Sequence, residues 1–287
     1  MLPYYNIGTK AIYLYDFFNY LSIAVLIVWV LTQAGTFTKV CPHAFKQKTN
    51  TRKWIVAAVE FIVMTYCGVG LLLVLNPRFG DWFTDGNANY YGSLTAYFIA
   101  FTVVSAVLGI SPLRSLDLLA PGLPLSLVVS KIACVTSGCC SSFEMPGSFY
   151  YNMDTGRYEF PIQMVEAAVA LLLFFFMLWY RKRARVSGEL FPVYLIAYSV
   201  TRFFLEFLRA DIAKIHGPID SYHVMSVLYA LLGIALLFFV KLKGDSINGW
   251  FDTKTDAEGK RAAASAKQSK GSNKNKKSGG EDRGKKK

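Results

Sequence analysis

The chain has 287 residues, of which 53% are hydrophobic and only 17% are charged, and its mean hydropathy is +0.33. Soluble globular domains carry about 25% charged residues, so this composition, with its long apolar runs, excludes an ordinary soluble enzyme and a disordered protein. The net charge of +12 is uneven, because residues 252–287 hold 12 basic and 5 acidic residues, a net +7, which leaves +5 for the rest. The charge therefore describes mainly a tail and does not indicate nucleic-acid binding.

Apolar segments long enough to cross a membrane follow one another along the chain. A spanning helix needs about 20 mostly apolar residues. Seven segments meet this length: 13–33, 54–75, 92–110, 116–135, 162–180, 190–208 and 224–240. The fourth contains Pro121 and Pro124 beside polar residues, which predicts a broken helix that lines a polar cavity, with a re-entrant or interfacial segment as the alternative. The first apolar stretch lacks a basic start and a small-residue cleavage site, so we expect no cleavable leader.

Lys and Arg gather in alternate loops of this arrangement. The loops after the first and fifth segments and the C-terminal tail are rich in basic residues, whereas the opposite loops hold only one or two each. Because cytoplasmic loops carry the excess of Lys and Arg, the pattern predicts an N-terminus outside and a C-terminus in the cytoplasm. We therefore expect an all-α integral membrane protein, in which residues 1–250 form a domain of about seven transmembrane helices.

The segment 251–287 differs from the rest in having almost no apolar residue. Since it cannot bury enough apolar surface to fold, its composition predicts a disordered, Lys-rich cytoplasmic tail. Such a tail can attract anionic lipid head groups or ribosomal RNA. A solvated tail that only reinforces the topology is the simpler interpretation and the one we favour.

The sixth apolar segment carries four polar side chains that are unusual in a membrane. Tyr198, Arg202, Glu206 and Arg209 lie at i, i+4, i+8 and i+11, so a helix places all four on one face. Because ionisable groups are costly in lipid, this face must line the bundle interior or a water-filled cavity. A guanidinium there suits a phosphate, which it binds through two parallel hydrogen bonds. A structural Arg–Glu pair that joins two helices is the alternative.

A second polar group opens the fifth segment. Gln163 and Glu166 lie at i and i+3 and share a helix face, and Pro161 precedes them at a position that suits a first helical turn. Glu166 lies within an apolar run and therefore needs a cationic partner. We expect that partner to be Arg202.

The fourth segment ends with Lys131 and a cysteine-rich turn. A cation beside the small-residue turn at Gly138 can hold an anionic head group. Adjacent cysteines such as Cys139 and Cys140 do not easily form a relaxed disulfide with each other. Pairing with Cys134 or metal binding is the alternative to free, packed thiols, which we expect. The scattered histidines have no zinc spacing, and the sequence holds no P-loop, nucleophile elbow or dinucleotide loop.

These residues occur in an order that resembles the bacterial prolipoprotein diacylglyceryl transferases, over roughly residues 15–240. The stretch 198–209 is similar to the family's Tyr-Gly-x-x-Arg-x-x-x-Glu-x-x-Arg. The stretch 161–166 resembles the family's Pro-Ser-Gln-Leu-Tyr-Glu without its tyrosine. Two further similarities are the Asp-x-x-Ala-Pro at 117–121 and Tyr15, which falls where the family has an early cavity tyrosine.

The chain departs from the family at several positions. Ser199 stands where glycine is usual. In the family's signature, Gly-Arg-Ile-Gly-Asn-Phe-x-Asn-Gly-Glu, the arginine is Lys131 here, the asparagine is Cys134 and the glutamate is Cys139. The family's histidine, held to assist catalysis, aligns with Tyr91. Lys131 keeps the charge but loses the bidentate fork, and a tyrosine with an ordinary pKa near 10 is a poor base at neutral pH.

The resemblance implies an enzyme of the bacterial inner (plasma) membrane that moves diacylglyceryl from phosphatidylglycerol to the lipobox cysteine of a prolipoprotein signal peptide, with release of glycerol phosphate. The catalytic residues that it implies are Arg202, Tyr91 and Glu206. The substrate-binding residues that it implies are Lys131, Tyr15, Tyr198, Gln163, Glu166, Arg209, Cys134 and Gly138. Its partners would be phosphatidylglycerol, the signal peptide and membrane lipid, with no nucleic acid, metal or cofactor.

The same residues allow two other functional interpretations. A diverged member of this family, with its signature changed at several polar positions, would be a lipid-binding membrane protein or a transferase that acts on another acceptor. An unrelated transporter or channel with a buried Arg–Glu pair is the third reading, and the complete polar stripe of the sixth segment argues against it.

Overall fold

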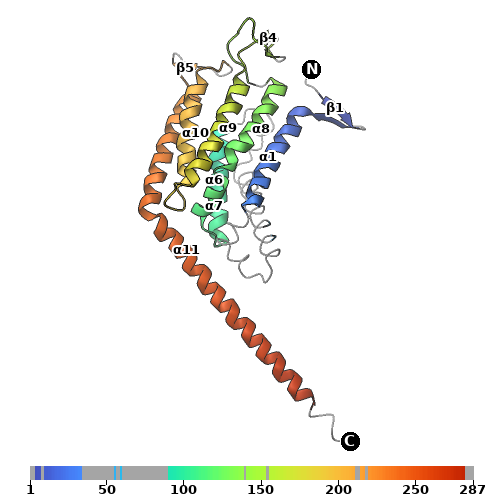
Figure 1. The fold of residues 1–287 in the computed structure, drawn as a ribbon, viewed down its shortest axis with the longest axis vertical. Helices are drawn as coiled ribbons and strands as arrows, with labels where there is room; N and C mark the ends of the chain where they lie inside the picture. The colour runs from blue at the N-terminus through green and yellow to red at the C-terminus, as the bar shows by residue number, and fades with distance from the viewer. Residues whose placement is uncertain are drawn as a thin grey trace.

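A bundle of helices with short hairpins at one end makes up the computed structural model of the chain (Figure 1). The structure describes residues 4–7, 10–33, 55, 59, 90–138, 140–152, 155–210, 214–216 and 219–281. The helices are α1 (Leu14–Thr32), α6 (Tyr90–Val107), α7 (Pro112–Leu119), α8 (Gly122–Ser137), α9 (Ile162–Arg181), α10 (Leu190–Glu206) and α11 (Ser221–Glu281). The paired strands are β1 (Tyr4–Ile7) with β2 (Lys10–Tyr13), β3 (Tyr151–Asn152) with β4 (Arg157–Tyr158), and β5 (Lys214–His216) with β6 (Ile219–Asp220), all antiparallel.

Most of the expected apolar segments coincide with these helices. Within the described residues, α9 and the stretch Tyr222–Thr253 of α11 are long and apolar enough to cross a membrane, and α7 with α8 makes a third span if the bent pair counts as one. The expected segment 54–75 lies almost wholly outside the described residues. The mostly helical membrane fold is thus confirmed, whereas seven spans and their orientation stay predictions. The three hairpins were not expected from the sequence.

The expected break in the fourth segment is confirmed. Helices α7 and α8 meet at 41°, and Pro121 lies at the break. Proline has no N–H to donate to the preceding turn, so it ends one helix and is tolerated at the start of the next. The carboxylate of Asp117 in α7 accepts the backbone N–H groups of Gly188 (2.6 Å) and Leu190 (2.9 Å). Since a helix N-terminus favours a negative charge, Asp117 fixes α7 to the start of α10.

Close helix packing positions α10, which carries the polar stripe. Gly233 of α11 faces α10 so closely that an added Cβ would lie 2.8 Å from Ile196 Cγ1 and 3.1 Å from the carbonyl oxygen of Pro192. Small residues permit such backbone approach between membrane helices. On the other side, α8 packs against α1 and α9. The polar face of α10 is therefore directed toward α8 and α9.

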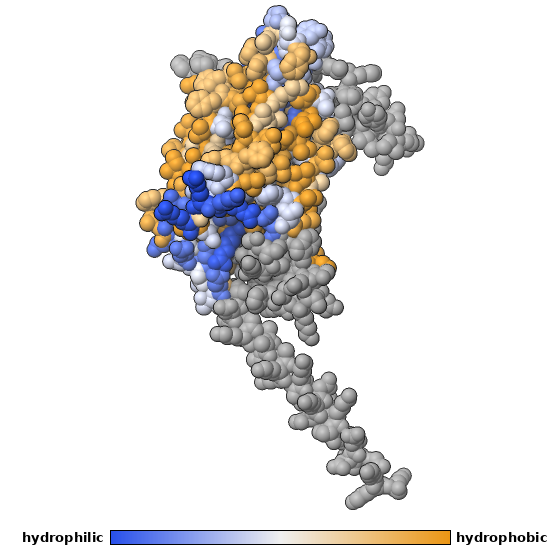
Figure 2. Space-filling model, in the orientation of Figure 1, coloured by the Kyte–Doolittle hydropathy of each residue, from blue (hydrophilic) through white to orange (hydrophobic). Residues whose placement is uncertain are grey.

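An apolar belt covers the bundle. Figure 2 shows hydrophobic residues over most of the helical surface on this face, with hydrophilic residues below the belt. Large apolar side chains on α9, α10 and α11 are well exposed, including Leu172 (68%), Phe204 (65%) and Phe238 (67%). Contiguous exposed apolar surface of this extent is unusual in a soluble monomer, and lipid contact accounts for it.

The C-terminal helix extends well past the bundle. Helix α11 continues to Glu281 and runs away from the bundle (Figure 1), and the disordered tail expected over residues 251–287 stays a prediction. The helix is also held to the bundle at the end of its apolar stretch, because Arg114 and Asp252 form a two-pronged ion pair at 2.5 and 2.8 Å. The residues after it include Ala, Lys, Arg, Gln and Glu, which are strong helix formers, and a helix needs only local hydrogen bonds.

Candidate functional site

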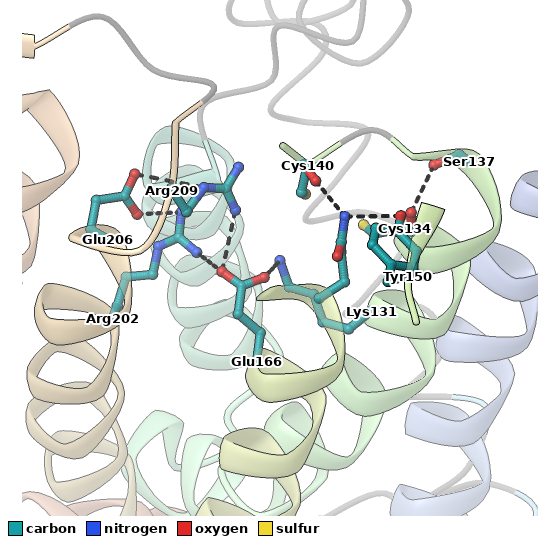
Figure 3. A network of polar contacts seen from close by, with 10 residues as sticks. Lys131, Cys134, Ser137, Cys140, Tyr150, Glu166, Arg202, Glu206 and Arg209 are labelled. Atoms are coloured by element: carbon teal, nitrogen blue, oxygen red, sulfur yellow. Dashed lines mark hydrogen bonds and ion pairs between the residues drawn. The ribbon is translucent and has the colours of Figure 1, made fainter. Parts of the chain in front are cut away.

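Five charged side chains from α8, α9 and the end of α10 converge in one cluster (Figure 3). Lys131 extends from α8 and Glu166 from α9, whereas Arg202, Glu206 and Arg209 come from the stripe that begins in α10. The spacing of the stripe therefore predicts its common face correctly. The expected pairing of Glu166 with Arg202 is confirmed.

Glu166 is the centre of the cluster. Its Oε2 atom lies 2.5 Å from Lys131 Nζ, and its Oε1 atom forms an ion pair with Arg202 Nη1 and lies 3.2 Å from Arg209 Nη1. Figure 3 shows the carboxylate directed between the two guanidinium groups and the ammonium group. One carboxylate thus engages three cations that come from two helices and the turn after α10.

Glu206 completes the cluster from within the stripe. Its Oε2 atom lies 2.7 Å from Arg202 Nη2, and its Oε1 atom lies 3.7 Å from Arg209 Nε. These are i, i+4 and i, i+3 pairs along the chain, so they do not depend on the position of α8 or α9. Glu206 therefore orients both guanidinium groups, one by each oxygen.

The cluster is buried and carries an excess positive charge. The exposed fraction of the five side chains runs from 0% for Glu206 to 14% for Lys131. Three cations and two carboxylates give these five residues a formal charge of +1. Because an uncompensated charge is costly away from water, the cluster favours a bound anion, and planar guanidinium groups suit phosphate oxygens.

A small cavity of about 20 Å³ adjoins the cluster. Lys131, Glu166, Tyr198 and Arg202 line its polar side, and apolar residues of α8, α9 and α10 line the remainder. A cavity of this size holds about one water molecule. A phosphate can therefore enter only when side chains of the cluster move.

The aromatic ring of Tyr222 lies against the Arg202 guanidinium group. The Cζ atom of Arg202 lies 5.4 Å from the centroid of the Tyr222 ring, which belongs to the first turn of α11. Tyr198 is buried and stacks on Tyr194 with the ring centroids 5.8 Å apart. A cation over an aromatic face is stabilised by the ring quadrupole. Sequence reasoning did not identify Tyr222, because its contact depends on the tertiary packing of α11 against α10.

The described residues between α8 and α9, 140–152 and 155–160, form a loop cap at this end of the bundle. Gln163 Nε2 donates to the Cys140 carbonyl oxygen and lies 3.3 Å from the Tyr150 hydroxyl oxygen. Ser142 Oγ donates to the Leu208 carbonyl oxygen at 2.5 Å, and the backbone of Ser142 pairs with that of Arg209. The cap therefore holds the turn that places Arg209 in the cluster. Gln163 is occupied with the cap, and its expected substrate contact stays a prediction.

Glu159 is the buried polar centre of the cap. Its carboxylate accepts hydrogen bonds from Thr155 Oγ1 (2.5 Å), Asn152 Nδ2 (2.9 Å) and the backbone N–H of Ser142 (3.1 Å). Burial alone would raise the pKa of the Glu159 carboxyl, but these hydrogen bonds and nearby Arg157 hold that pKa below its usual value. Nothing in the sequence distinguished Glu159 from an exposed loop carboxylate.

The other expected site residues lie at different distances from the cluster. Cys134 is half-buried and lies one turn after Lys131 in α8. Gly138 ends that helix in a left-handed conformation (φ 71°), as the small-residue turn predicts. Tyr15 lies on α1, is 36% exposed, and is not among the described residues that line the cavity.

Two expected residues fall outside what the structure describes. Tyr91 lies in the first turn of α6, but its side chain is outside the described part of the chain, and Cys139 is outside it altogether. Cys134 and Cys140 are reduced thiols outside any disulfide bond, as expected. Within the described ranges, no group of three or more His, Cys, Asp or Glu side chains is arranged to hold a metal ion.

The amino-acid sequence is similar to those of several known proteins. The chain is 30% identical over 165 residues to phosphatidylglycerol–prolipoprotein diacylglyceryl transferase 2 of Clostridium perfringens, which covers 55% of this chain and 64% of that protein. It is 31% identical over 128 residues to the transferase of Clostridium tetani (42% and 51%) and 27% identical over 201 residues to that of Staphylococcus carnosus (66% and 71%). The chain thus spans less than two thirds of the first two relatives.

A family model gives a longer match than these pairwise comparisons. The model described as prolipoprotein diacylglyceryl transferase matches residues 4–239. That range includes all five members of the charged cluster, the loop cap and the broken helix pair. The chain therefore belongs to the prolipoprotein diacylglyceryl transferase family.

Proposed function

We propose that this chain transfers the diacylglyceryl group of phosphatidylglycerol to the lipobox cysteine of a prolipoprotein signal peptide and releases glycerol phosphate. The observation that carries the proposal is the buried cluster of charge +1 among apolar helices. A phosphodiester carries one negative charge, so a bound phosphatidylglycerol head group would neutralise the cluster. The names of the related transferases support the same substrates.

Each side chain of the cluster has a distinct task in this reaction. The lipobox thiol releases its proton to water, and its sulfur attacks the diacylglyceryl carbon that is bonded to the phosphate oxygen. The bond from that carbon to the oxygen breaks, and glycerol phosphate leaves with the bonding electrons on that oxygen. Arg202 is placed to stabilise the charge that develops on the leaving phosphate. Lys131 is placed to hold the head group, and Glu206 orients Arg202 and Arg209. Tyr15, Tyr91 and Tyr198 are the proposed hydrogen-bond donors.

The membrane arrangement that suits this reaction has seven spans, an external N-terminus and a cytoplasmic C-terminus in the bacterial inner membrane. The cluster lies at the end of the bundle that carries the loop cap, opposite the end from which α11 leaves (Figure 1). With this orientation the charged cluster lies near the outer side of the membrane, beneath the loop cap. A lipobox cysteine reaches that side when its preprotein is exported.

The test is a transfer assay with the full-length protein in detergent. Phosphatidylglycerol and a lipobox peptide are supplied, and both the mass increase of the peptide and glycerol phosphate release are measured. We expect both signals with the cysteine peptide and neither with its Cys→Ser counterpart. Arg202→Ala should lower the rate about 100-fold or more, whereas Arg183→Ala, the same change at an exposed arginine, should not. Full transfer by Arg202→Ala would overturn the proposed role of the cluster.

A diverged lipid-binding protein is the second candidate, because Lys131, Cys134 and Cys139 replace polar residues of the family's signature and Tyr91 stands where the family has a histidine. The same assay separates the two functions. Phosphatidylglycerol that copurifies and stays unreacted, in a protein that releases no glycerol phosphate with any lipobox peptide, would favour lipid binding without transfer.

A further inference from the structure

We propose that the Glu166 carboxylate is an internal competitor of the substrate phosphate, which occupies the three cations of the cluster between turnovers and speeds the release of the phosphate product. The proposal rests on the proposed function and assigns Glu166 a task beyond orienting Arg202. Glu166 is therefore a positioning residue whose contacts must break when the phosphate binds.

Glu166 already makes the contacts that a bound phosphate would make. Its two oxygens engage Lys131, Arg202 and Arg209, which are all the cations of the cluster. A carboxylate and a phosphodiester each carry one negative charge and offer several acceptor oxygens. The two anions therefore compete for the same donors.

The space beside Glu166 is too small for a phosphate. The cavity beside Glu166 holds about 20 Å³, which is room for about one water molecule. The Glu166 side chain is 3% exposed and fills the position between Lys131 and the arginines. A phosphate that binds Lys131 and Arg202 from this cavity must therefore take the place of this carboxylate.

The product carries more negative charge than the substrate phosphate. Glycerol phosphate is a phosphate monoester with a charge of about −1.5 to −2 at pH 7, whereas the lipid phosphodiester carries −1. Three cations would hold the product more tightly than the substrate, and a tightly held product slows turnover. When the Glu166 carboxylate returns, it restores three ion pairs and so offsets the cost of separating the cations from the product.

Glu206 provides the matched control, because it also carries one negative charge and also contacts Arg202 and Arg209. Its ion pairs with Arg202 and Arg209 run along one continuous segment of chain, at i, i+4 and i, i+3, whereas those of Glu166 reach across from α9. Removal of either carboxylate changes the charge of the cluster from +1 to +2. Only removal of Glu166 empties the position shared by all three cations.

The experiment measures binding of glycerol phosphate and of inorganic phosphate to the full-length wild type, Glu166→Gln and Glu206→Gln in detergent. We expect Glu166→Gln to bind both anions about tenfold more tightly than the wild type, and Glu206→Gln to gain clearly less. In turnover with phosphatidylglycerol, Glu166→Gln should lower both KM and kcat, because the product leaves more slowly. Glu166→Asp, whose shorter side chain cannot reach all three cations, should bind with intermediate affinity.

Three outcomes would overturn the proposal. Unchanged or weaker anion binding by Glu166→Gln would show that Glu166 only organises the cations. An equal gain in Glu206→Gln would show that net charge alone sets the affinity. If Glu166→Gln does not fold, Glu166→Asp decides, and an affinity at or below that of the wild type contradicts the proposal. A wild type without transferase activity would refute the proposed function, while the comparison with inorganic phosphate would still test the competition.

Discussion

Two polar regions at opposite ends of the bundle use their carboxylates in different ways. Asp117 accepts three backbone N–H groups, from Gly188, Leu190 and Phe191, and joins α7 to α10. Glu166 instead engages three charged side chains in a cluster with an excess positive charge. Backbone donors are fixed by the fold and cannot be given up without unfolding it, whereas side-chain donors can exchange one anion for another. The comparison separates a structural carboxylate from a functional one.

The largest effect should follow from changing the cluster without changing its charge. Arg202→Lys keeps the positive charge but loses the planar fork that now engages Glu166 and Glu206. We expect glycerol phosphate release to fall about 100-fold. Arg114→Lys makes the same change at the other end of the bundle, and release should stay within about twofold of the wild type. Release by Arg202→Lys above a tenth of the wild-type rate would remove the basis of the comparison.

The next effect concerns stability. Asp117→Asn keeps the shape of the side chain, but it replaces one of the two acceptor oxygens by an NH2 group, which cannot accept a backbone N–H from the start of α10. A buried N–H left without an acceptor costs about 1–3 kcal/mol, so thermal unfolding in detergent should shift down by several degrees. The KM for phosphatidylglycerol should stay unchanged. The control is Asp252→Asn, an exposed ion-pair partner of Arg114, which should cost less than about 1 kcal/mol. A changed KM with unchanged stability would contradict the structural role of Asp117.

A third effect depends on pH and concerns the loop cap. Hydrogen bonds hold the pKa of Glu159 below its usual value in the folded protein, so its ionised form stabilises the cap. That contribution is present above the unfolded pKa and is lost as the pH falls through the lowered folded pKa. We expect the protection of backbone amides in residues 140–160 against hydrogen exchange, taken relative to the intrinsic exchange rate at each pH, to fall once the pH drops below about 4.5. Glu159→Gln should weaken this pH dependence, and an unaltered profile in that variant would assign the effect to another group.

The smallest effect should come from the ring behind Arg202. Tyr222→Leu removes the aromatic face whose centroid lies 5.4 Å from Arg202 Cζ. A cation–π contact contributes about 0.5–2 kcal/mol, so glycerol phosphate release should fall between about twofold and thirtyfold. Tyr222→Phe keeps the ring and should be close to the wild type. An equal loss in Tyr222→Phe would assign the effect to the hydroxyl group.

The predictability of the site depended on whether its contacts lie along one helix. The periodicity of 198–209 placed the stripe on one face, and the need of Glu166 for a cation indicated Arg202, which the structure confirms. The salt bridge between Lys131 and Glu166 joins α8 to α9, and no spacing within either helix indicates it. The contribution of Tyr222 likewise depends on the packing of α11.

The fold was predictable to a similar degree. Apolar runs and two prolines predicted the helices and the broken pair α7–α8. The short hairpins have too few residues for a period-two pattern to be recognised. For the C-terminal segment, composition does not distinguish a disordered chain from an isolated helix of strong helix formers, so the expected disorder stays a prediction.

The most direct test of the charged cluster as a catalytic site is complementation of bacterial cells depleted of their own diacylglyceryl transferase. The chain is expressed as wild type and as Arg202→Ala, and lipid modification of a reporter prolipoprotein is measured. We predict that the wild type restores the modified reporter and that Arg202→Ala, present in the membrane at the same level, does not. Modification restored equally by both, or by neither when a related transferase restores it, would contradict the account.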